Sequence, residues 1–250
     1  MKKLDYLKKE LMQFLNSFKL KFNFIQILLY DLLFYAIIVP SLLFIPNFLN
    51  KQGAKIDQSL LTQEAIMKAT EVELQLFYSQ LRNLVIAAVV GIAALLLIAL
   101  LAWSLSRGLI YTKLLKKKFT SKYFKKFIGL NLVLGIALLV ITPFLATLLK
   151  VQLIYLSLAI LLIIAYFTTM IYIQFTKNNL IFASIGDGLS FGAKNILKLI
   201  IPIILIIIVG YILMKVSYNL PEISFAPLIL VAAYMAWLRI YFINKVNQLA

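Results

Sequence analysis

The sequence predicts an all-α fold, a polytopic membrane helix bundle of about six transmembrane helices, arranged as three hairpins with both termini in the cytoplasm. Composition is the first reason. Of the 250 residues, 63% are hydrophobic and 14% are charged, whereas a soluble domain is roughly half apolar and about a quarter charged. One globular core cannot bury so much apolar surface, so lipid is expected to surround much of it. The second reason is the spacing of the apolar runs.

Residues 1–22 form a basic segment before the first apolar run. Leucines and phenylalanines recur in it at helical spacing, with lysines between them. This pattern predicts an amphipathic helix on the cytoplasmic membrane surface, with a short solvated helix as the alternative. No small-residue cleavage site follows, so the first apolar run is expected to stay in the mature protein as a signal anchor.

Residues 23–250 are predicted to form a single transmembrane domain. Its apolar runs are each close to the roughly 20 residues that a bilayer-spanning helix requires. We place the spans at 23–46, 83–106, 127–149, 152–175, 197–216 and 226–244. A tight turn at 150–152 predicts that the third and fourth spans form an antiparallel hairpin.

The distribution of positive charge predicts the orientation. Segment 107–126 holds eight basic residues, from Arg107 to Lys126, and no acidic residue. Lys and Arg are enriched in cytoplasmic loops, so this segment is placed inside. Alternation along the chain then puts the N-terminus, 176–196 and the C-terminus in the cytoplasm.

The external segment 47–82 is predicted to be helical and to run into the second span. It has no Gly or Pro after Ala54, and Asp57 or Ser59 is a candidate N-cap. Apolar residues recur in it every seven positions. The expected helix 57–82 covers its own bundle or offers a surface to a protein partner.

The inward-starting spans share a design. Each follows a Lys-bearing aromatic segment and contains a proline, at Pro40, Pro143 and Pro202. The stretch from Asn23 to Pro40 has the same length as that from Lys126 to Pro143. Internal repeats of this kind occur in transporters and also arise from duplication without a transport role.

Asp31 is singled out as the one ionisable residue inside an apolar run, about 12 Å along the first span at 1.5 Å per residue. An intramembrane carboxylate is costly unless it is paired, which makes Asp31 a candidate functional residue. The alternatives are that Lys21 or the basic loop pairs with it near the interface, or that the span begins later.

The glycine cluster from Gly186 to Gly192 does not have the spacing of a dinucleotide-binding loop. We predict a cytoplasmic turn there, with Asp187 or Ser190 capping the helix that enters the fifth span.

The residue inventory argues against an enzyme. The chain has no Cys and no His, which excludes thiol nucleophiles, imidazole acid–base chemistry and Cys or His metal sites. Glu64, Glu71 and Glu73 are predicted to lie on a solvated helical face. We expect no catalytic residues, no metal and no cofactor.

Short motifs resemble a known membrane domain. They are Ser17-Phe18-Lys19-Leu20 with Asp31-Leu32-Leu33-Phe34, and Ala183-Ser184-Ile185 with the stretch from Phe191 to Leu197. The order of these motifs along the chain resembles that in prokaryotic six-span membrane proteins, which are similar to the membrane domain of glycerophosphodiester phosphodiesterases. The chain has no hydrolase domain, so the resemblance implies a fold and no activity.

The leading hypothesis is a non-enzymatic, multi-pass protein of a prokaryotic cell membrane, acting as a scaffold or accessory subunit. Its basic face is expected to contact anionic lipid headgroups, and nucleic acid is not an expected partner. The candidate headgroup contacts are Lys113, Lys116, Lys117, Lys118, Lys122, Lys125, Lys126, Lys194 and Lys198. The alternatives are a small-solute transporter or channel that uses Asp31, and a lipid-modifying membrane enzyme.

Overall fold

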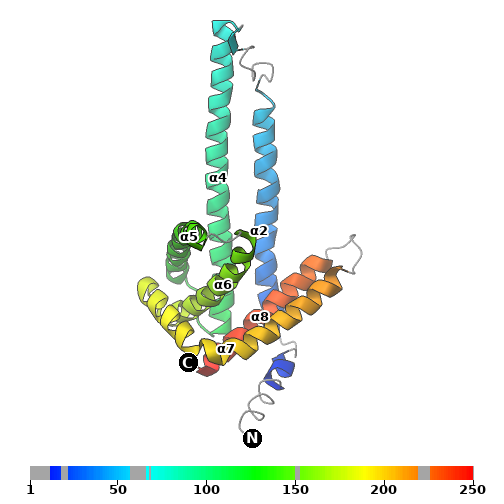
Figure 1. Ribbon diagram of the computed structural model, residues 1–250, viewed down its shortest axis with the longest axis vertical. Coiled ribbons are helices and arrows are strands. Elements are labelled where there is room, and N and C mark those ends of the chain that lie inside the picture. Colours follow the sequence, from blue (N-terminus) through cyan, green and yellow to red (C-terminus); the bar gives the residue numbers. More distant parts are fainter. Residues whose placement is uncertain are drawn as a thin grey trace. The chain divides into compact units, whose positions relative to one another are not determined.

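The computed structural model describes residues 12–17, 22–56, 66–67, 69–149, 153–218 and 226–249, and these residues form helices and no strand. The long helices are α2 (Phe22–Gly53), α4 (Glu71–Leu114), α5 (Ser121–Leu149), α6 (Leu153–Asn178), α7 (Ile181–Tyr218) and α8 (Ala226–Leu249) (Figure 1). The prediction of an all-α polytopic membrane bundle is confirmed.

Five helices in the described part of the chain are long and apolar enough to cross a bilayer. They contain the stretches Asn23–Gly53, Glu71–Leu114, Ser121–Ile141, Ile181–Ser217 and Ile229–Leu249. The fourth predicted span, 152–175, falls on α6, a helix of 26 residues. The prolines Pro40, Pro143 and Pro202 lie inside α2, α5 and α7, as predicted. The cytoplasmic placement of the termini stays a prediction.

The chain divides into two compact units. The first, which we call the polar unit, comprises Met1–Leu32 and Ser104–Ala250, and the second, the hairpin unit, comprises Leu33–Trp103. Helices α2 and α4 contribute residues to both units.

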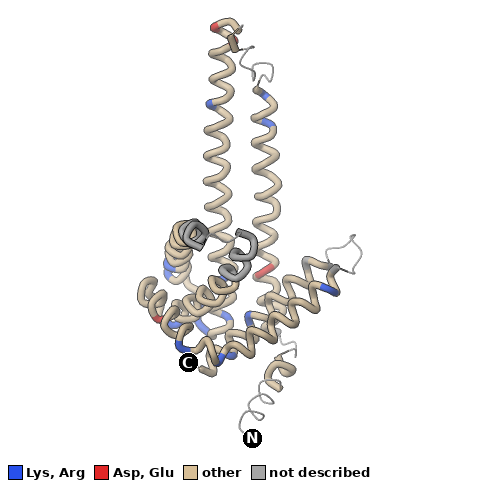
Figure 2. The backbone as a smooth tube through the Cα atoms, in the orientation of Figure 1, with Lys and Arg blue, Asp and Glu red and all other residues tan. Residues whose placement is uncertain are grey.

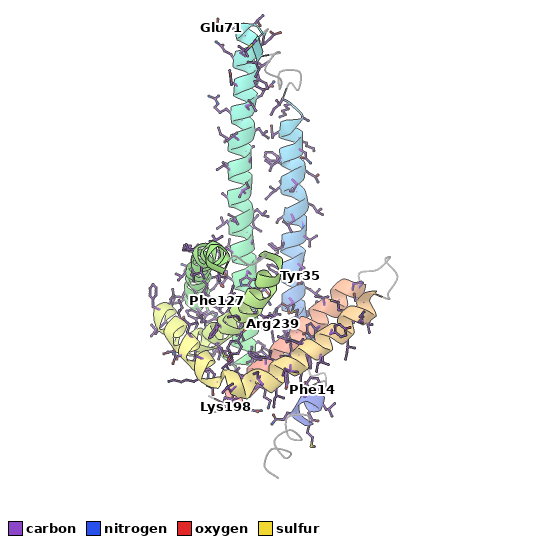
Figure 3. The ribbon with its side chains drawn as sticks, in the orientation of Figure 1. Phe14, Tyr35, Glu71, Phe127, Lys198 and Arg239 are labelled. Carbon is purple, nitrogen blue, oxygen red and sulfur yellow. The ribbon has the colours of Figure 1, made fainter. Side chains whose placement is uncertain are left out.

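In the polar unit, α6 packs most extensively against α7, and α7 packs next against α8. The pairing of α7 with α8 agrees with the predicted third hairpin. The predicted second hairpin corresponds to α5 and α6. Among the described residues, α6 contacts α5 less than it contacts α7. The core holds aromatic side chains that include Phe127, Phe175 and Trp237 (Figure 3).

The close approach of α6 and α7 corrects the prediction of a turn at the glycine cluster. Residues Ile181–Tyr218 form one helix, and the chain turns earlier, at Asn179, which has a φ of 56°. A Cβ atom on Gly188 would lie 2.7 Å from the Cα atom of Ile171, and one on Gly192 would lie 2.9 Å from the ring of Phe167. The glycines therefore permit helix packing and do not break the helix.

Most of the basic segment 107–126 is helical, although a loop was predicted there. Helix α4 continues to Leu114, and α5 begins at Ser121. Lys116 has a φ of 54°, and the Lys117 N–H donates to the Thr112 carbonyl at 2.8 Å, which is the pattern of a Schellman C-cap. Thr120 caps α5, because its Oγ1 accepts from the Tyr123 N–H at 3.2 Å.

The hairpin unit contains the second part of α2 and the first part of α4. A Cβ atom on Gly91 of α4 would lie 3.3 Å from Cγ2 of Ile45 on α2, so the two helices approach closely there. Phe34 and Trp103 make an edge-to-face ring contact at 5.5 Å. At 44 residues, α4 is about 66 Å long and exceeds the predicted span 83–106 at both ends.

The N-terminal end of α4 is capped by Thr70, which was not among the predicted caps. The Thr70 N–H and hydroxyl donate to Glu73 Oε2 at 2.7 and 2.8 Å, and the Glu73 N–H points back to Thr70 Oγ1 at 3.4 Å. This is a capping box, and its signature is Thr70-Glu71-Val72-Glu73. The predicted caps Asp57 and Ser59 lie outside the described residues.

Candidate functional site

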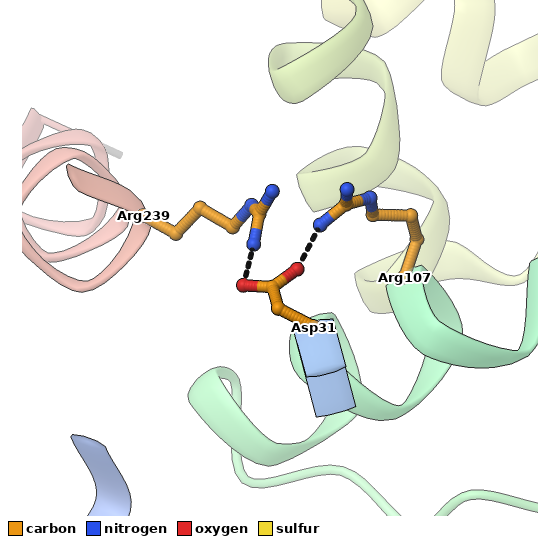
Figure 4. Close-up of polar contacts among 3 residues, drawn as sticks. All are labelled: Asp31, Arg107 and Arg239. Carbon is orange, nitrogen blue, oxygen red and sulfur yellow. Dashed lines mark hydrogen bonds and ion pairs between the residues drawn. The ribbon is translucent and has the colours of Figure 1, made fainter. Parts of the chain in front are cut away.

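Asp31 lies at the centre of a buried ion cluster that three helices form. It is 2% exposed and accepts a hydrogen bond at Oδ1 from Arg107 Nη1 at 2.7 Å. Its other oxygen, Oδ2, accepts from Nη1 of Arg239. Figure 4 shows the two guanidinium groups reaching the carboxylate from different helices, α4 and α8. We call Asp31, Arg107 and Arg239 the ion triad; all three belong to the polar unit.

Of the ion triad, Asp31 was singled out from the sequence, and Arg107 belongs to the basic segment that was named as an alternative partner. The alternative that the basic segment pairs with Asp31 is confirmed by Arg107, while Lys21 lies outside the described residues. The description of Asp31 as the one ionisable residue in an apolar run is wrong. Arg239 lies inside the predicted sixth span, 226–244, so a signal was present.

An apolar cluster lies on the same three helices as the ion triad. Ile27, Ile110 and Ala236 are fully buried and pack together. Each lies about one helical turn from a triad residue on the same helix. The triad itself is largely buried, and a low local dielectric makes charge-assisted hydrogen bonds strong.

Burying these charges is costly unless all of them are paired. An ion that moves into a low-dielectric interior loses several kcal/mol of hydration free energy. An ion pair with good geometry restores about the same amount through the attraction between its partners. Polar groups inside membrane bundles therefore usually face one another, as these three do. The arrangement fixes α2, α4 and α8 in one register within the polar unit.

A second polar cluster joins α4, α5 and α6. Asn131 donates through Nδ2 to Ser104 Oγ at 2.9 Å, and its Oδ1 accepts from the Tyr172 hydroxyl. One turn further along α6, Thr176 Oγ1 lies 3.0 Å from the hydroxyl of Tyr123. The meeting of these polar residues was not predicted, because helical periodicity does not say which faces of different helices pack together.

The candidate headgroup lysines are mostly exposed. Lys126 is the exception, because it is half-buried and donates through Nζ to the Asn179 carbonyl at 3.0 Å. The exposed ones are Lys113, Lys116, Lys117, Lys118, Lys122, Lys125, Lys194 and Lys198. Figure 2 shows basic residues gathered in the polar unit around the chain between α4 and α5 and on the first half of α7.

The described part of the N-terminal segment, residues 12–17, is helical and packs on α8. The ring of Phe14, which Figure 3 labels, makes edge-to-face contacts with Trp237 and Tyr241, at 5.7 and 5.6 Å. The Trp237 N–H donates to Ser17 Oγ at 2.9 Å. Beside this contact lies an open pocket of about 200 Å³, lined by Gln13, Asn16, Ser17, Tyr241, Asn244, Lys245 and Gln248.

The described residues contain no group of three His, Cys, Asp or Glu side chains close enough to hold a metal ion. Comparisons with protein-family models, with curated proteins and with solved structures find no match for this chain. The resemblance to the membrane domain of glycerophosphodiester phosphodiesterases therefore stays a prediction.

Proposed function

We propose that this chain is a non-enzymatic scaffold or accessory subunit of a prokaryotic cell membrane, and that its basic cytoplasmic side binds anionic lipid headgroups. The observation that carries the proposal is the exposure of eight lysines on two stretches, 113–125 and 194–198. Neither stretch contains an acidic residue that would compete with lipid for these lysines.

The magnitude of the attraction is sufficient for stable lipid contact. Each basic residue near an anionic leaflet contributes about 1 kcal/mol, so several together outweigh the cost of holding their side chains at the surface. The attraction acts over about one Debye length, roughly 8 Å at physiological ionic strength. Contact therefore depends on salt and on lipid charge, but only weakly on lipid shape.

The polar interior supports a structural role over a catalytic one. Asp31 is engaged by two guanidinium groups, and Asn131 is engaged by Ser104 and Tyr172. Groups that are fully committed to one another hold helices in place. A scaffold needs such a fixed arrangement.

The test of lipid contact is a triple substitution, Lys116→Gln with Lys117→Gln and Lys118→Gln. We expect the variant to retain several-fold less phosphatidylglycerol than the native chain when both are purified from mixed nanodiscs and analysed by native mass spectrometry. The matched control removes three charges from the hairpin unit, at Lys51, Lys55 and Arg82. Equal lipid loss in the test and control variants would refute the proposal that the exposed lysines of 113–125 bind the lipid.

A transporter or channel is the second candidate, and the buried charges favour it, because ionisable groups inside membrane bundles often mark ion or solute paths. A flux assay on proteoliposomes that contain either the native chain or the Asp31→Asn variant distinguishes a transporter from a scaffold. A flux that the substitution abolishes supports transport. Absence of flux for ions and small solutes supports the scaffold.

A further inference from the structure

The first part of α7, residues 181–198, has an exposed apolar side. At 3.6 residues per turn, positions that follow one another by three or four residues fall on the same side of a helix. Five exposed residues of α7 have this spacing, namely Phe182, Gly186, Leu189, Ala193 and Ile196. We call these five residues the apolar stripe. Its largest member, Phe182, is 77% exposed.

The other two faces of this part of α7 have different compositions. One face is buried and includes Ser184, Gly188 and Asn195, and the close approach of Gly188 to Ile171 shows that it packs on α6. The third face is exposed and polar, and it lies beside the apolar stripe. Its residues are Asp187, Ser190, Lys194 and Lys198. A helix with adjacent apolar and polar exposed faces is typical of a membrane interface.

Length and charge place the two parts of α7 differently with respect to a bilayer. The helix has 38 residues and is about 57 Å long, whereas the hydrocarbon core of a bilayer is about 30 Å thick. Residues 181–198 contain three charged side chains, and residues 199–214 contain none. The second part is therefore the one that suits the hydrocarbon core, and the first part lies at or beyond the membrane surface.

The helix bends between these two parts. Figure 1 shows the first part of α7, drawn in yellow, running in a different direction from the later part, drawn in orange. Pro202 lies inside the helix and has no N–H to donate to the carbonyl of Lys198, and a missing bond of this kind bends helices. Because of the bend, the first part is able to follow the membrane surface instead of projecting straight away from it.

The apolar stripe continues onto the membrane-spanning part of α7. Ile200, Ile204 and Ile207 extend the same spacing and are 45%, 50% and 49% exposed. Lipid acyl chains surround the exposed face of a membrane span, so they adjoin the stripe where the two parts of the helix meet. Lys194 and Lys198 lie beside the stripe, and lysines in this position extend their ammonium groups toward the headgroups.

From the three faces, the bend and the continuity of the stripe, we infer that the first part of α7 lies in the plane of the membrane interface. Phe182, Leu189 and Ile196 insert among the acyl chains, and the polar face meets the headgroups and water. The partner of the stripe is the lipid surface itself. This goes beyond the proposed function, because it concerns apolar side chains and does not depend on the binding of headgroups by lysines.

The test uses single spin labels, which the sequence favours because the native chain has no Cys. Phe182→Cys and Leu189→Cys place labels on the stripe, and Asp187→Cys and Ser190→Cys place matched labels on the polar face of the same helix. Each labelled full chain is reconstituted into phosphatidylcholine liposomes. Collisions of the label with oxygen, which partitions into lipid, and with a water-soluble nickel chelate are then measured by electron paramagnetic resonance.

We expect the ratio of oxygen to nickel accessibility to be several-fold higher on the stripe than on the polar face. Similar ratios on the two faces would overturn the inference, because the stripe would then lie in water. Low accessibility of the stripe to both reagents would also overturn it, because a protein surface would then cover the stripe. Ala193→Cys is the milder substitution on the stripe and serves if the variants at larger residues do not fold.

The proposed lysine contacts are tested separately, so the two ideas fail independently. If the stripe labels report lipid while the triple variant at Lys116, Lys117 and Lys118 keeps its phosphatidylglycerol, the lysine proposal fails and the inference on α7 stands. If the triple variant loses its lipid while the stripe labels report water, the lysine proposal stands and the inference on α7 is wrong.

Discussion

The polar unit and the hairpin unit are built from the same kind of apolar helix but are stabilised differently. In the polar unit, buried charged and polar side chains meet between helices, as the ion triad and the cluster around Asn131 show. In the hairpin unit, the described buried side chains are apolar, with Ile45 and Phe77 the most buried large ones. The described hydrogen bonds of its serines stay within one helix, as that of Ser41 with the Ile37 carbonyl does.

This difference follows from lipid being the solvent of the membrane-spanning helices. Lipid is as apolar as a leucine side chain, so apolar faces gain little from packing against each other inside a bilayer. Polar contacts and close packing at small residues therefore determine which helices associate. We expect the polar unit to have a specific, mutation-sensitive interior and the hairpin unit to tolerate substitution.

The largest expected effect comes from removing the carboxylate of the ion triad. Asp31→Leu removes the carboxylate that both buried guanidinium groups contact, and we expect the free energy of unfolding to fall by about 3–5 kcal/mol. The measurement is unfolding in zwitterionic micelles, followed by tryptophan fluorescence. Arg239→Gln is the control, because it leaves the one-to-one pair of Asp31 and Arg107 intact. Equal losses for the two variants would contradict a role for the Asp31 carboxylate in stabilising both arginines.

The next effect concerns the glycines of α7. Gly188→Ala places a methyl group 2.7 Å from the Ile171 backbone, which cannot move aside cheaply, and we expect a loss of about 1–3 kcal/mol. Gly186→Ala is a matched control two residues away, where a Cβ atom has open space. The control is expected to gain about 0.5–1 kcal/mol, since alanine favours helix over glycine.

In the hairpin unit, Gly91→Ala extends the same comparison. Its Cβ atom would meet a side-chain methyl of Ile45 at 3.3 Å, which can shift by a few tenths of an ångström. We expect a smaller loss than at Gly188, measured by the same unfolding assay. A loss at Gly91 as large as that at Gly188 would show that the hairpin unit is as tightly constrained as the polar unit.

The glycines also show how far the sequence could predict the fold. Apolar run length predicted the helices, because a bilayer imposes a minimum length on each span. The turn predicted at Gly186–Gly192 was wrong, because glycine is compatible both with a turn and with close helix packing. The spacing Ser184, Gly188, Gly192, with small residues four apart, was the available signal for packing.

The candidate site was predictable for a different reason. Asp31 and Arg239 are visible as charges inside apolar runs, and the cost of burial implies that they pair. Which helices meet is a property of the tertiary fold, so the grouping of Asp31 with Arg107 and Arg239 needed the structure. The same holds for Asn131 and Tyr172, which are distant in sequence and lie on different helices.

A smaller effect is expected in the polar cluster around Asn131. Tyr172→Phe removes the donor to Asn131 Oδ1, and interhelical hydrogen bonds in membranes contribute about 0.6 kcal/mol on average and up to about 1.7. We expect a loss in this range in the unfolding assay. Ser41→Ala in the hairpin unit is the control, because its hydroxyl bonds only within its own helix, and no measurable change is expected. A larger loss at Ser41 than at Tyr172 would reverse the comparison of the two units.

The smallest global effect is expected at the start of α4, where the hairpin unit does depend on a polar contact. Thr70→Ala removes the hydroxyl that pairs with Glu73, and loss of such a cap destabilises a helix by about 0.5–2 kcal/mol. Because the cap lies at an exposed helix end, this cost is expected as local fraying of the first turn and not as loss of the whole fold. Hydrogen exchange at the amides of residues 71–74 measures it, with Ser79→Ala as the control, since the Ser79 hydroxyl bonds to the Leu76 carbonyl inside the helix. Faster exchange confined to the first turn would show that polar contacts in this unit act only at helix ends. Faster exchange along α4 as far as Gly91 would show instead that the cap supports the whole helix pair.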